Sequence, residues 1–253
     1  MKPYYEKDGI VIYHGDCREV LPSLPSDYFD LVLTDPPYGH NNNSNDLIHR
    51  WEVALGKQKH VEESRPIAND GVEANKLVRW CMSEWHRVLK DCCCCCCCCG
   101  GGGPDPQFAR WSLWLDEVFN FKQMVVWDKG PMGMGWHYRR SYETVLVGTK
   151  GSGKCNWYDE TDRVENIIRD IPKIIPSKTD HPTPKPEILM KRFISWHTKE
   201  HDIVLVSFMG AGTTLRAAKD LNRRAIGIEI EERYCEIAAK RLAQEVFSFT
   251  GNV

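Results

Sequence analysis

The segment Asp35-Pro36-Pro37-Tyr38 places hydrogen-bond acceptors next to an aromatic ring. Its two prolines lack an amide hydrogen, so their carbonyl oxygens and the Asp35 carboxylate remain as acceptors. An amino group on a flat heterocycle has two hydrogens. Asp35 and the Pro36 carbonyl could accept both while Tyr38 stacks on the heterocycle. The segment is a candidate catalytic site that exposes the lone pair of an amino nitrogen, although Asp-Pro-Pro also suits an ordinary turn.

A glycine-rich segment, residues 206–214, reads Val-Ser-Phe-Met-Gly-Ala-Gly-Thr-Thr and follows an apolar run. Gly210 and Gly212 allow a tight turn and a close approach of the backbone to a ligand, and the helix expected after them offers unpaired amide donors. Glu229 ends the next apolar run, where a carboxylate can accept hydrogen bonds from both hydroxyls of a ribose. This pattern indicates half of a nucleotide-binding βαβ unit, with a tight turn in any α/β domain as the alternative.

Both candidate sites depend on strands that alternate with helices. We expect strands near residues 10–14, 29–34, 92–99, 122–127, 143–148, 203–207 and 225–229. Apolar residues at helical spacing predict helices near residues 73–89, 107–120, 185–198, 213–221 and 231–246. The alternation predicts the α/β class, with a doubly wound, mostly parallel seven-stranded sheet covered on both faces. Both candidate sites then lie at carboxyl ends of strands, where such sheets bind ligands.

Length and composition are consistent with a single domain over residues 1–253. The hydrophobic fraction is 42%, and a chain of this size can bury a substantial core. The net charge of −2 does not by itself predict a large phosphate-binding surface. No segment has the pattern of a signal peptide, and no apolar run reaches the roughly 20 residues of a membrane span. We therefore expect a soluble, cytoplasmic protein that does not act at a membrane.

Cysteine usage is the most unusual feature of the composition, because Cys92 to Cys99 form an unbroken run of eight. Zinc ligands usually come in pairs from separate turns, so the run does not resemble a zinc site and no metal is expected. Neighbouring side chains of a strand point to opposite faces, which disfavours a ladder of disulfides and favours a buried strand of small apolar thiols. Labile metal binding or oxidation is the alternative. The other cysteines are scattered, at Cys17, Cys81, Cys155 and Cys235.

Six segments resemble, in order, the motifs of the amino-directed DNA methyltransferases that use S-adenosylmethionine, in the permuted arrangement called the β group. They are His14-Gly15-Asp16-Cys17, Asp35 to Tyr38, Trp127-Asp128-Lys129 with Arg140 and Glu143, His181-Pro182-Thr183-Pro184-Lys185-Pro186, Phe208 to Thr214, and Ile226 to Ile230. The resemblance covers most of the chain. It implies a Rossmann-like methyltransferase fold with a small inserted target-recognition region, and the activity of a site-specific DNA methyltransferase.

The resemblance implies a role for each matched position. The catalytic residues would be Asp35, Pro36, Pro37 and Tyr38, which hold the target amino nitrogen in line with the methyl group after the base has flipped out of the duplex. Asp16 would bind the cofactor adenine, Lys185 the methionine carboxylate and Glu229 the ribose. The residues expected to bind S-adenosylmethionine are Asp16, Cys17, Asp35, His181, Thr183, Lys185, Phe208, Met209, Gly210, Gly212, Thr213, Thr214 and Glu229.

Two long polar segments correspond to DNA-contacting regions of the family. Residues 39–70 would help to close over the flipped base, and residues 149–182 occupy the position of the target-recognition region. Arginine and asparagine suit base edges, and lysine suits phosphates. The residues expected to bind DNA are Asn41, Arg50, Lys57, Arg139, Arg140, Lys154, Arg163 and Arg169.

One position departs from the family pattern. The family usually has Asp-Pro immediately before the phenylalanine of the glycine-rich loop, where this chain has Val206-Ser207. The departure predicts that one cofactor contact is missing or replaced. Asp202 lies too far back along the expected strand to substitute for it.

The implied reaction is methylation of the adenine amino group in double-stranded DNA, because Asp before Pro-Pro resembles the adenine subset of the family. Methylation of the cytosine N4 amino group is the first alternative, since the same acceptors serve either amino group. A DNA-binding relative with weak turnover is the second, and RNA or protein as substrate is the third. No cysteine lies beside Asp35 to Tyr38, which argues against covalent methylation of a ring carbon. The resemblance is also compatible with a homodimer, with a cognate restriction endonuclease, and with a bacterial or phage-infected cell as the location.

Overall fold

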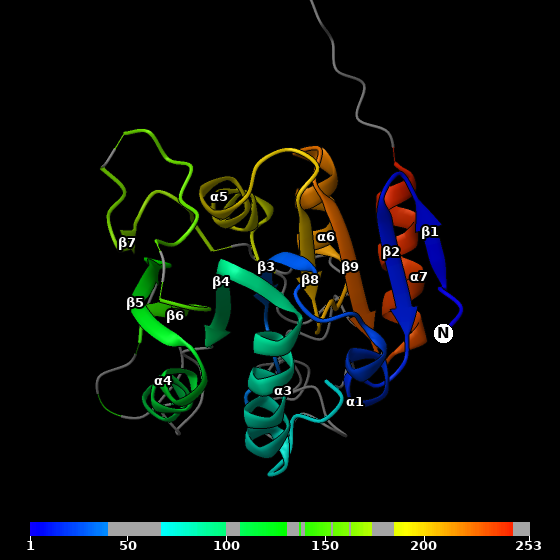
Figure 1. The fold of residues 1–253 in the computed structure, drawn as a ribbon, viewed down its shortest axis with the longest axis horizontal. Coiled ribbons are helices and arrows are strands. Elements are labelled where there is room, and N and C mark those ends of the chain that lie inside the picture. The colour runs from blue at the N-terminus through cyan, green and yellow to red at the C-terminus, as the bar shows by residue number, and fades with distance from the viewer. Residues whose placement is uncertain are drawn as a thin grey trace, which may run out of the picture.

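Helices cover both faces of one mixed sheet in the computed structural model (Figure 1). The structure describes residues 1–39, 67–99, 107–130, 137, 140–152, 154–161, 163–173 and 185–244. The expected α/β class and the doubly wound arrangement are confirmed.

Within the described residues the sheet has nine strands, in the order β1-β2-β9-β8-β3-β4-β6-β5-β7. Strands β2, β9, β8, β3 and β4 are mutually parallel, whereas β6 runs antiparallel between β4 and β5, and β1 is antiparallel to β2. The expected number of seven was too low, because the edge strands β1 and β7 are too short to leave a periodic signal. The strands are β1 (Tyr5–Lys7), β2 (Ile10–His14), β3 (Phe29–Thr34), β4 (Leu89–Cys99), β5 (Asn120–Asp128), β6 (Tyr142–Thr149), β7 (Ile167–Ile168), β8 (Ile203–Val206) and β9 (Arg224–Glu229).

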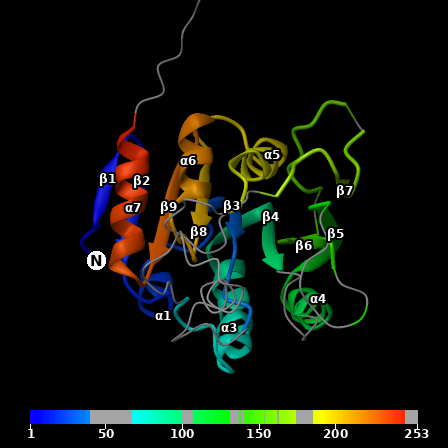
Figure 2. The same ribbon diagram turned by 180° about the vertical axis from the view of Figure 1, so that it is seen from behind.

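The helices form two groups, one on each face of the sheet (Figure 2). One group is α1 (Cys17–Val20), α3 (Ala74–Val88) and α4 (Gln107–Val118), with the short 3-10 helix η1 (Leu21–Ser23); the other is α5 (Glu187–His197), α6 (Thr213–Asp220) and α7 (Glu232–Ala243). Side chains of β3 alternate between the groups, since Val32 packs with α3 while Leu31 and Leu33 pack with α5 and α6. Every helix in the described part of the chain is too short or too polar to cross a membrane.

The cysteine run forms most of β4, as expected for small apolar side chains. Its odd-numbered members Cys93 to Cys97 lie on the face covered by α3 and α4, and its even-numbered members Cys94 to Cys98 lie on the face covered by α5. Burial raises the pKa of the Cys93 thiol to about 11 and holds the pKa of Cys95 well above its usual value. These thiols are therefore neutral and poorly reactive.

One member of the run pairs with a cysteine outside it. Cys94 forms a disulfide with Cys155, and their Cα atoms are 6.7 Å apart. The disulfide attaches the segment that follows β6 to the first half of β4. The isolated position of Cys155 in the sequence carried no signal for this pairing, which the fold alone creates.

His197 ends α5 and packs beside this segment, and the residue is 5% exposed. Burial lowers the pKa of His197 to about 4, and the Asn156 backbone opposes that effect only in part. The imidazole is therefore neutral in the folded protein at neutral pH.

We expect the free energy of unfolding to decrease between pH 7 and pH 5, in part because of His197. Its pKa is about 4 in the folded protein against an ordinary value of 6.5, so the unfolded chain takes up the proton first as the pH falls. The lost contribution from this group should be about 2 kcal/mol over that interval. Urea denaturation across this pH range measures it.

His197→Gln should show a smaller loss over the same pH range, and His201→Gln is the matched control because His201 is exposed. An unchanged pH dependence in His197→Gln would contradict the assignment.

Candidate active site

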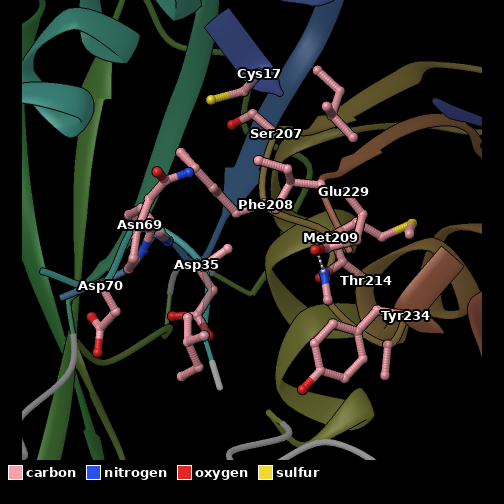
Figure 3. A pocket seen from close by; sticks show the side chains of 18 of the residues that line it. Cys17, Asp35, Asn69, Asp70, Ser207, Phe208, Met209, Thr214, Glu229 and Tyr234 are labelled. Carbon is pink, nitrogen blue, oxygen red and sulfur yellow. Dashed lines mark hydrogen bonds between the residues drawn. The ribbon is translucent and has the colours of Figure 1, made fainter. Parts of the chain in front are cut away.

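Four parallel strands end at one edge of the sheet and surround a single pocket (Figure 3). β2, β3, β8 and β9 are followed there by Gly15, Asp35, Ser207 and Ile230. Because the carboxyl ends of parallel strands meet, the two candidate sites of the sequence open into the same space. Figure 3 labels lining side chains from both sites and from neighbouring segments, which are Cys17, Asp35, Asn69, Asp70, Ser207, Phe208, Met209, Thr214, Glu229 and Tyr234.

The segment from Asp35 to Tyr38 leaves the end of β3 and lines the pocket. Pro36 and Pro37 are buried and cannot donate to a neighbouring strand, so pairing of β3 with β4 stops at Thr34. The backbone therefore leaves the sheet at the prolines. Neither proline has an amide hydrogen that could bond to the carbonyl oxygens of this segment.

Tyr38 fixes the orientation of the Asp35 carboxylate. The Tyr38 hydroxyl donates a short hydrogen bond to Asp35 Oδ1. The Tyr38 ring packs against Trp111 with 6.0 Å between ring centroids, and Gln107 Nε2 donates to the Tyr38 carbonyl at 2.9 Å. Burial and the Asp35 charge raise the pKa of Tyr38 well above its usual value, so the hydroxyl remains a donor.

The ammonium group of Lys185 connects this segment to β6. Lys185 Nζ donates to Asp35 Oδ2 at 2.6 Å and to the Tyr38 hydroxyl oxygen at 3.2 Å, and it lies 3.3 Å from Glu143 Oε2. Lys129 Nζ binds Glu143 Oε1 at 2.9 Å. Burial acts to lower the pKa of Lys185, but the Asp35 and Glu143 carboxylates outweigh it and raise that pKa. Burial acts to raise the pKa of Glu143, but the two lysines outweigh this effect, so the pKa is lowered.

The glycine-rich loop adopts the backbone conformation that its glycines permit. Gly210 and Gly212 have φ angles of 52° and 77°, and a Cβ atom on Gly212 would lie 2.6 Å from the Cβ atom of Ala238 in α7. Glu229 Oε2 accepts from the Gly210 amide at 2.8 Å, and Glu229 Oε1 accepts from the Glu231 amide at 2.9 Å. Burial raises the pKa of Glu229, although both amides act to lower it. The Glu229 carboxylate is thus held in one orientation at the end of β9.

Ser207 occupies the position where the family usually has a proline. The residue is 1% exposed, and its Oγ atom lies 3.2 Å from Thr34 Oγ1 and accepts from Trp85 Nε1 at 2.9 Å. Ser207 therefore attaches β3 and α3 to the start of the loop. Asp202 lies at the other end of β8, where its Oδ2 atom accepts from the Lys199 amide at 2.9 Å, so it does not substitute for the missing acidic residue.

Most residues expected to bind the cofactor line the pocket, together with the four catalytic residues. The lining members are Cys17, Asp35, Lys185, Phe208, Met209, Gly210, Thr213, Thr214 and Glu229, with Pro36, Pro37 and Tyr38. Gly212 instead packs behind the loop against α7. The Asp16 carboxylate caps α1, where it accepts from the Arg18 amide at 2.8 Å and pairs with the Arg18 guanidinium, which lowers the pKa of Asp16. His181 and Thr183 lie outside the described residues.

Residues 67–70, the end of the segment expected to close over the flipped base, form a second wall of the pocket, and none of them was expected individually as a site residue. Asp70 is 1% exposed, and its Oδ1 atom accepts from the Gly39 amide at 2.7 Å, so it holds the end of the catalytic segment. Asn69 has a φ angle of 59°. The turn pattern Asn-Asp-Gly before α3 was the available signal, but it does not indicate a ligand.

The residues expected to bind DNA are divided between two ends of the sheet. Arg140 precedes β6 and Arg169 follows β7, both on the pocket edge. Lys154 belongs to a segment that bonds to Cys92 at the amino end of β4, away from the pocket. Arg163 is exposed before β7. Outside the described residues lie Asn41, Arg50, Lys57 and Arg139.

The pocket can hold an amino group and a nucleoside at the same time. Asp35 and the Pro36 carbonyl are acceptors beside the Tyr38 ring, Glu229 can accept from two hydroxyl groups, and Lys185 can attract a carboxylate.

Comparison with known proteins agrees with this arrangement. The chain is 27% identical to the Type II methyltransferase M2.DpnII of Streptococcus pneumoniae, over 96% of this chain and 93% of that enzyme. It is 25% identical to the DNA adenine methyltransferase YhdJ of Escherichia coli K12, over 94% and 84% of the two chains. A putative DNA modification methylase of Thermus thermophilus, solved in complex with S-adenosyl-L-methionine, has a TM-score of 0.67 at 25% identity and covers 94% of this chain and 95% of its own.

The DNA methylase family profile, N6_N4_Mtase, matches residues 29–240. This match contains the catalytic segment, Lys185, the glycine-rich loop and Glu229, which form one pocket in the structure. The chain therefore belongs to the DNA methylase family.

Proposed function

We propose that this DNA methyltransferase transfers the methyl group of its cofactor, S-adenosylmethionine, to the N6 amino group of adenine in double-stranded DNA. The observation that carries the proposal is that the Asp35 and Glu229 carboxylates line one pocket. Adenine is favoured by Asp before Pro-Pro, which resembles the adenine subset, and by the Escherichia coli relative, whose name specifies adenine. The acceptors would also fit the cytosine N4 amino group, so identification of the product decides between them.

The residues of the pocket fit S-adenosylmethionine by their chemistry. Glu229 receives one backbone amide on each oxygen and keeps lone pairs for ribose hydroxyls. The positive φ angles of the loop bring its backbone close to the pocket, and Lys185 offers a cation to the methionine carboxylate. The cofactor supplies a methyl group on a positively charged sulfur.

Alignment, rather than proton abstraction, is the main task of the catalytic segment. Asp35 and the Pro36 carbonyl accept the two amino hydrogens and direct the nitrogen lone pair away from themselves. Tyr38 donates a hydrogen bond to one Asp35 oxygen and Lys185 donates one to the other. These bonds fix the carboxylate, and each oxygen keeps a lone pair for the target amino group. As the nitrogen becomes positively charged, the negative Asp35 stabilises it, and the nitrogen then releases one proton to solvent water.

The target base has to leave the duplex before it reaches this site. Unstacking costs a few kcal/mol, which stacking on the Tyr38 ring and hydrogen bonds to Asp35 offset. Among the described residues expected to bind DNA, Arg140 and Arg169 lie on the same edge as the pocket.

A DNA-binding relative with weak turnover is the second candidate, and Val206-Ser207 is the observation that favours it. Buried Val206 stands where the family usually has the aspartate and Ser207 where it has the proline, so the end of β8 carries no carboxylate. The presence of Asp35, Tyr38, Lys185 and Glu229 in the pocket counts against this candidate.

We further infer, from the resemblance alone, that the chain is a single domain in which residues 149–182 recognise the target sequence. From the same resemblance we infer a homodimer, a cognate restriction endonuclease, and the cytoplasm of a bacterial or phage-infected cell as the location.

We expect Asp35→Asn to lower methyl transfer by at least about a hundredfold, because one of two acceptors for the amino hydrogens is weakened and the charge is lost. The protein is incubated with labelled S-adenosylmethionine and unmethylated genomic DNA, and mass spectrometry identifies the methylated nucleoside. N6-methyladenine from the wild type supports the proposal, and N4-methylcytosine would replace adenine with cytosine as the target.

Asp27→Asn is the matched control, because Asp27 pairs with Lys150 at the opposite end of the sheet and should leave turnover unchanged. Full activity in Asp35→Asn would refute the catalytic role of Asp35.

We expect Glu229→Gln to weaken binding of S-adenosylmethionine by about 10- to 100-fold. A glutamine side chain has a single acceptor oxygen, so one of the amides of Gly210 and Glu231 loses its partner, at about 1–3 kcal/mol, and the ribose loses a charged acceptor. Isothermal titration calorimetry measures the affinity. The exposed Glu232→Gln should bind like the wild type, and equal affinity in Glu229→Gln would rule out the ribose contact.

A further inference from the structure

Two cysteines and one histidine form a cluster outside the candidate active site. Cys94 comes from β4, Cys155 from the segment after β6, and His197 from the last turn of α5. Their ligand atoms, two sulfurs and a ring nitrogen, all lie within 4.8 Å of one another. The fold thus brings together, from three separate elements, the side-chain types that bind zinc.

His197 has an unsatisfied polar atom at this position. It is 5% exposed, and its Nδ1 atom has no hydrogen-bond partner among the described residues. A buried polar atom without a partner is destabilising. The Trp157 ring packs edge-on against His197 at 5.3 Å between ring centroids and stacks on Trp196 at 6.0 Å, so packing holds the imidazole in place. The Asn156 backbone already interacts with the ring, so a metal ion bound by the two sulfurs would give the buried imidazole a second partner.

We propose that Cys94 and Cys155, when reduced, bind a zinc ion together with His197. In the disulfide form the two sulfurs are bonded to each other. An external dithiol transfers two electrons and two protons to this disulfide and leaves as its own disulfide, which yields two thiols. Both thiols then release their protons to solvent as the ion binds two thiolates and a neutral imidazole. The disulfide and the zinc complex are alternative states of the same three residues.

Only a small adjustment separates these residues from zinc geometry. Bonds of about 2.3 Å to sulfur and 2.0 Å to nitrogen place tetrahedral ligand atoms roughly 3.5–3.8 Å apart. The separation between the ring nitrogen and a sulfur, at most 4.8 Å, would therefore shrink by about 1 Å, whereas the two sulfurs, bonded in the disulfide, would move apart by roughly 1.5–2 Å after reduction. Cys155 is only half-buried, so its side chain can move and the ion can enter from its side. Three protein ligands leave the fourth position to water.

The cluster is separate from the pocket. Cys94 pairs with Leu31, whereas Cys97 pairs with Thr34 next to the catalytic segment, so the two places differ by three residues, about 10 Å along the strand. Near the cluster, the Asn156 amide donates to Cys92 and the Tyr158 amide donates to Trp196. A zinc ion would strengthen the attachment of this segment to β4 and α5, and its binding can be measured without methyl transfer.

Cobalt(II) is a spectroscopic probe for such a site. The full-length protein is reduced with a phosphine, freed of it without air, and titrated with cobalt(II) alone. We expect one equivalent per chain to bind, with thiolate-to-cobalt charge-transfer absorption and the visible absorption of tetrahedral cobalt, and zinc should displace it. The oxidised wild-type protein should show neither absorption, a comparison that needs no substitution.

Variants locate the ligands. Cys155→Ala should lose the thiolate absorption at one equivalent, and His197→Gln should bind at least about tenfold more weakly, since even loss of a partner to a metal ligand costs 10- to 100-fold. Cys95→Ala, on the opposite face of β4, is the matched control and should bind like the wild type. Circular dichroism confirms that each variant is folded. No thiolate absorption in the reduced wild type, or unchanged absorption in Cys155→Ala, would overturn the proposal.

Discussion

The buried ammonium group of Lys185 is the interaction on which the candidate site depends. It lies between the carboxylates of Asp35 and Glu143, which could not both be charged in that space without a cation. Lys129 binds the other oxygen of Glu143 and balances the charges. Removing one member of a buried ion pair typically costs about 3–5 kcal/mol, because the other charge is left unpaired. Lys185 therefore holds the end of β3 against the beginning of β6 and, with Tyr38, sets the position of the acceptor carboxylate.

The sheet provides the second constraint. β3, β8 and β9 are parallel neighbours, so the residues after them must emerge side by side. The two prolines stop the pairing of β3 at the point where Asp35 is needed, and the hydrogen bonds of Ser207 to Thr34 and Trp85 attach the glycine-rich loop to the same edge. The cysteine cluster lies farther back along β4, so the two sites can differ in redox state or occupancy without sharing a residue.

The strongest sequence patterns were sufficient for the centre of the fold. Apolar runs and glycine positions predicted β3, β8, β9 and the helices near them, and the parallel arrangement then placed Asp35 and Glu229 in one pocket. Other features arise only in three dimensions. Asp70 accepts from the Gly39 amide although the two residues are far apart in the sequence, and Lys185, expected at the cofactor, also bonds to Asp35. Asp16 carries an acidic side chain at a matching position, yet its carboxylate is engaged by Arg18 and caps α1, which no motif reveals.

A crystal structure with a non-reactive analogue of S-adenosylmethionine and a methylatable DNA duplex would show which groups hold the target amino group. We expect the target amino nitrogen to lie within hydrogen-bond distance of the Asp35 carboxylate and the Pro36 carbonyl, with the Tyr38 ring against the base. Lys185 should remain close to Glu143. A target base held by other acceptors, or bound away from Asp35, would contradict this account of the site.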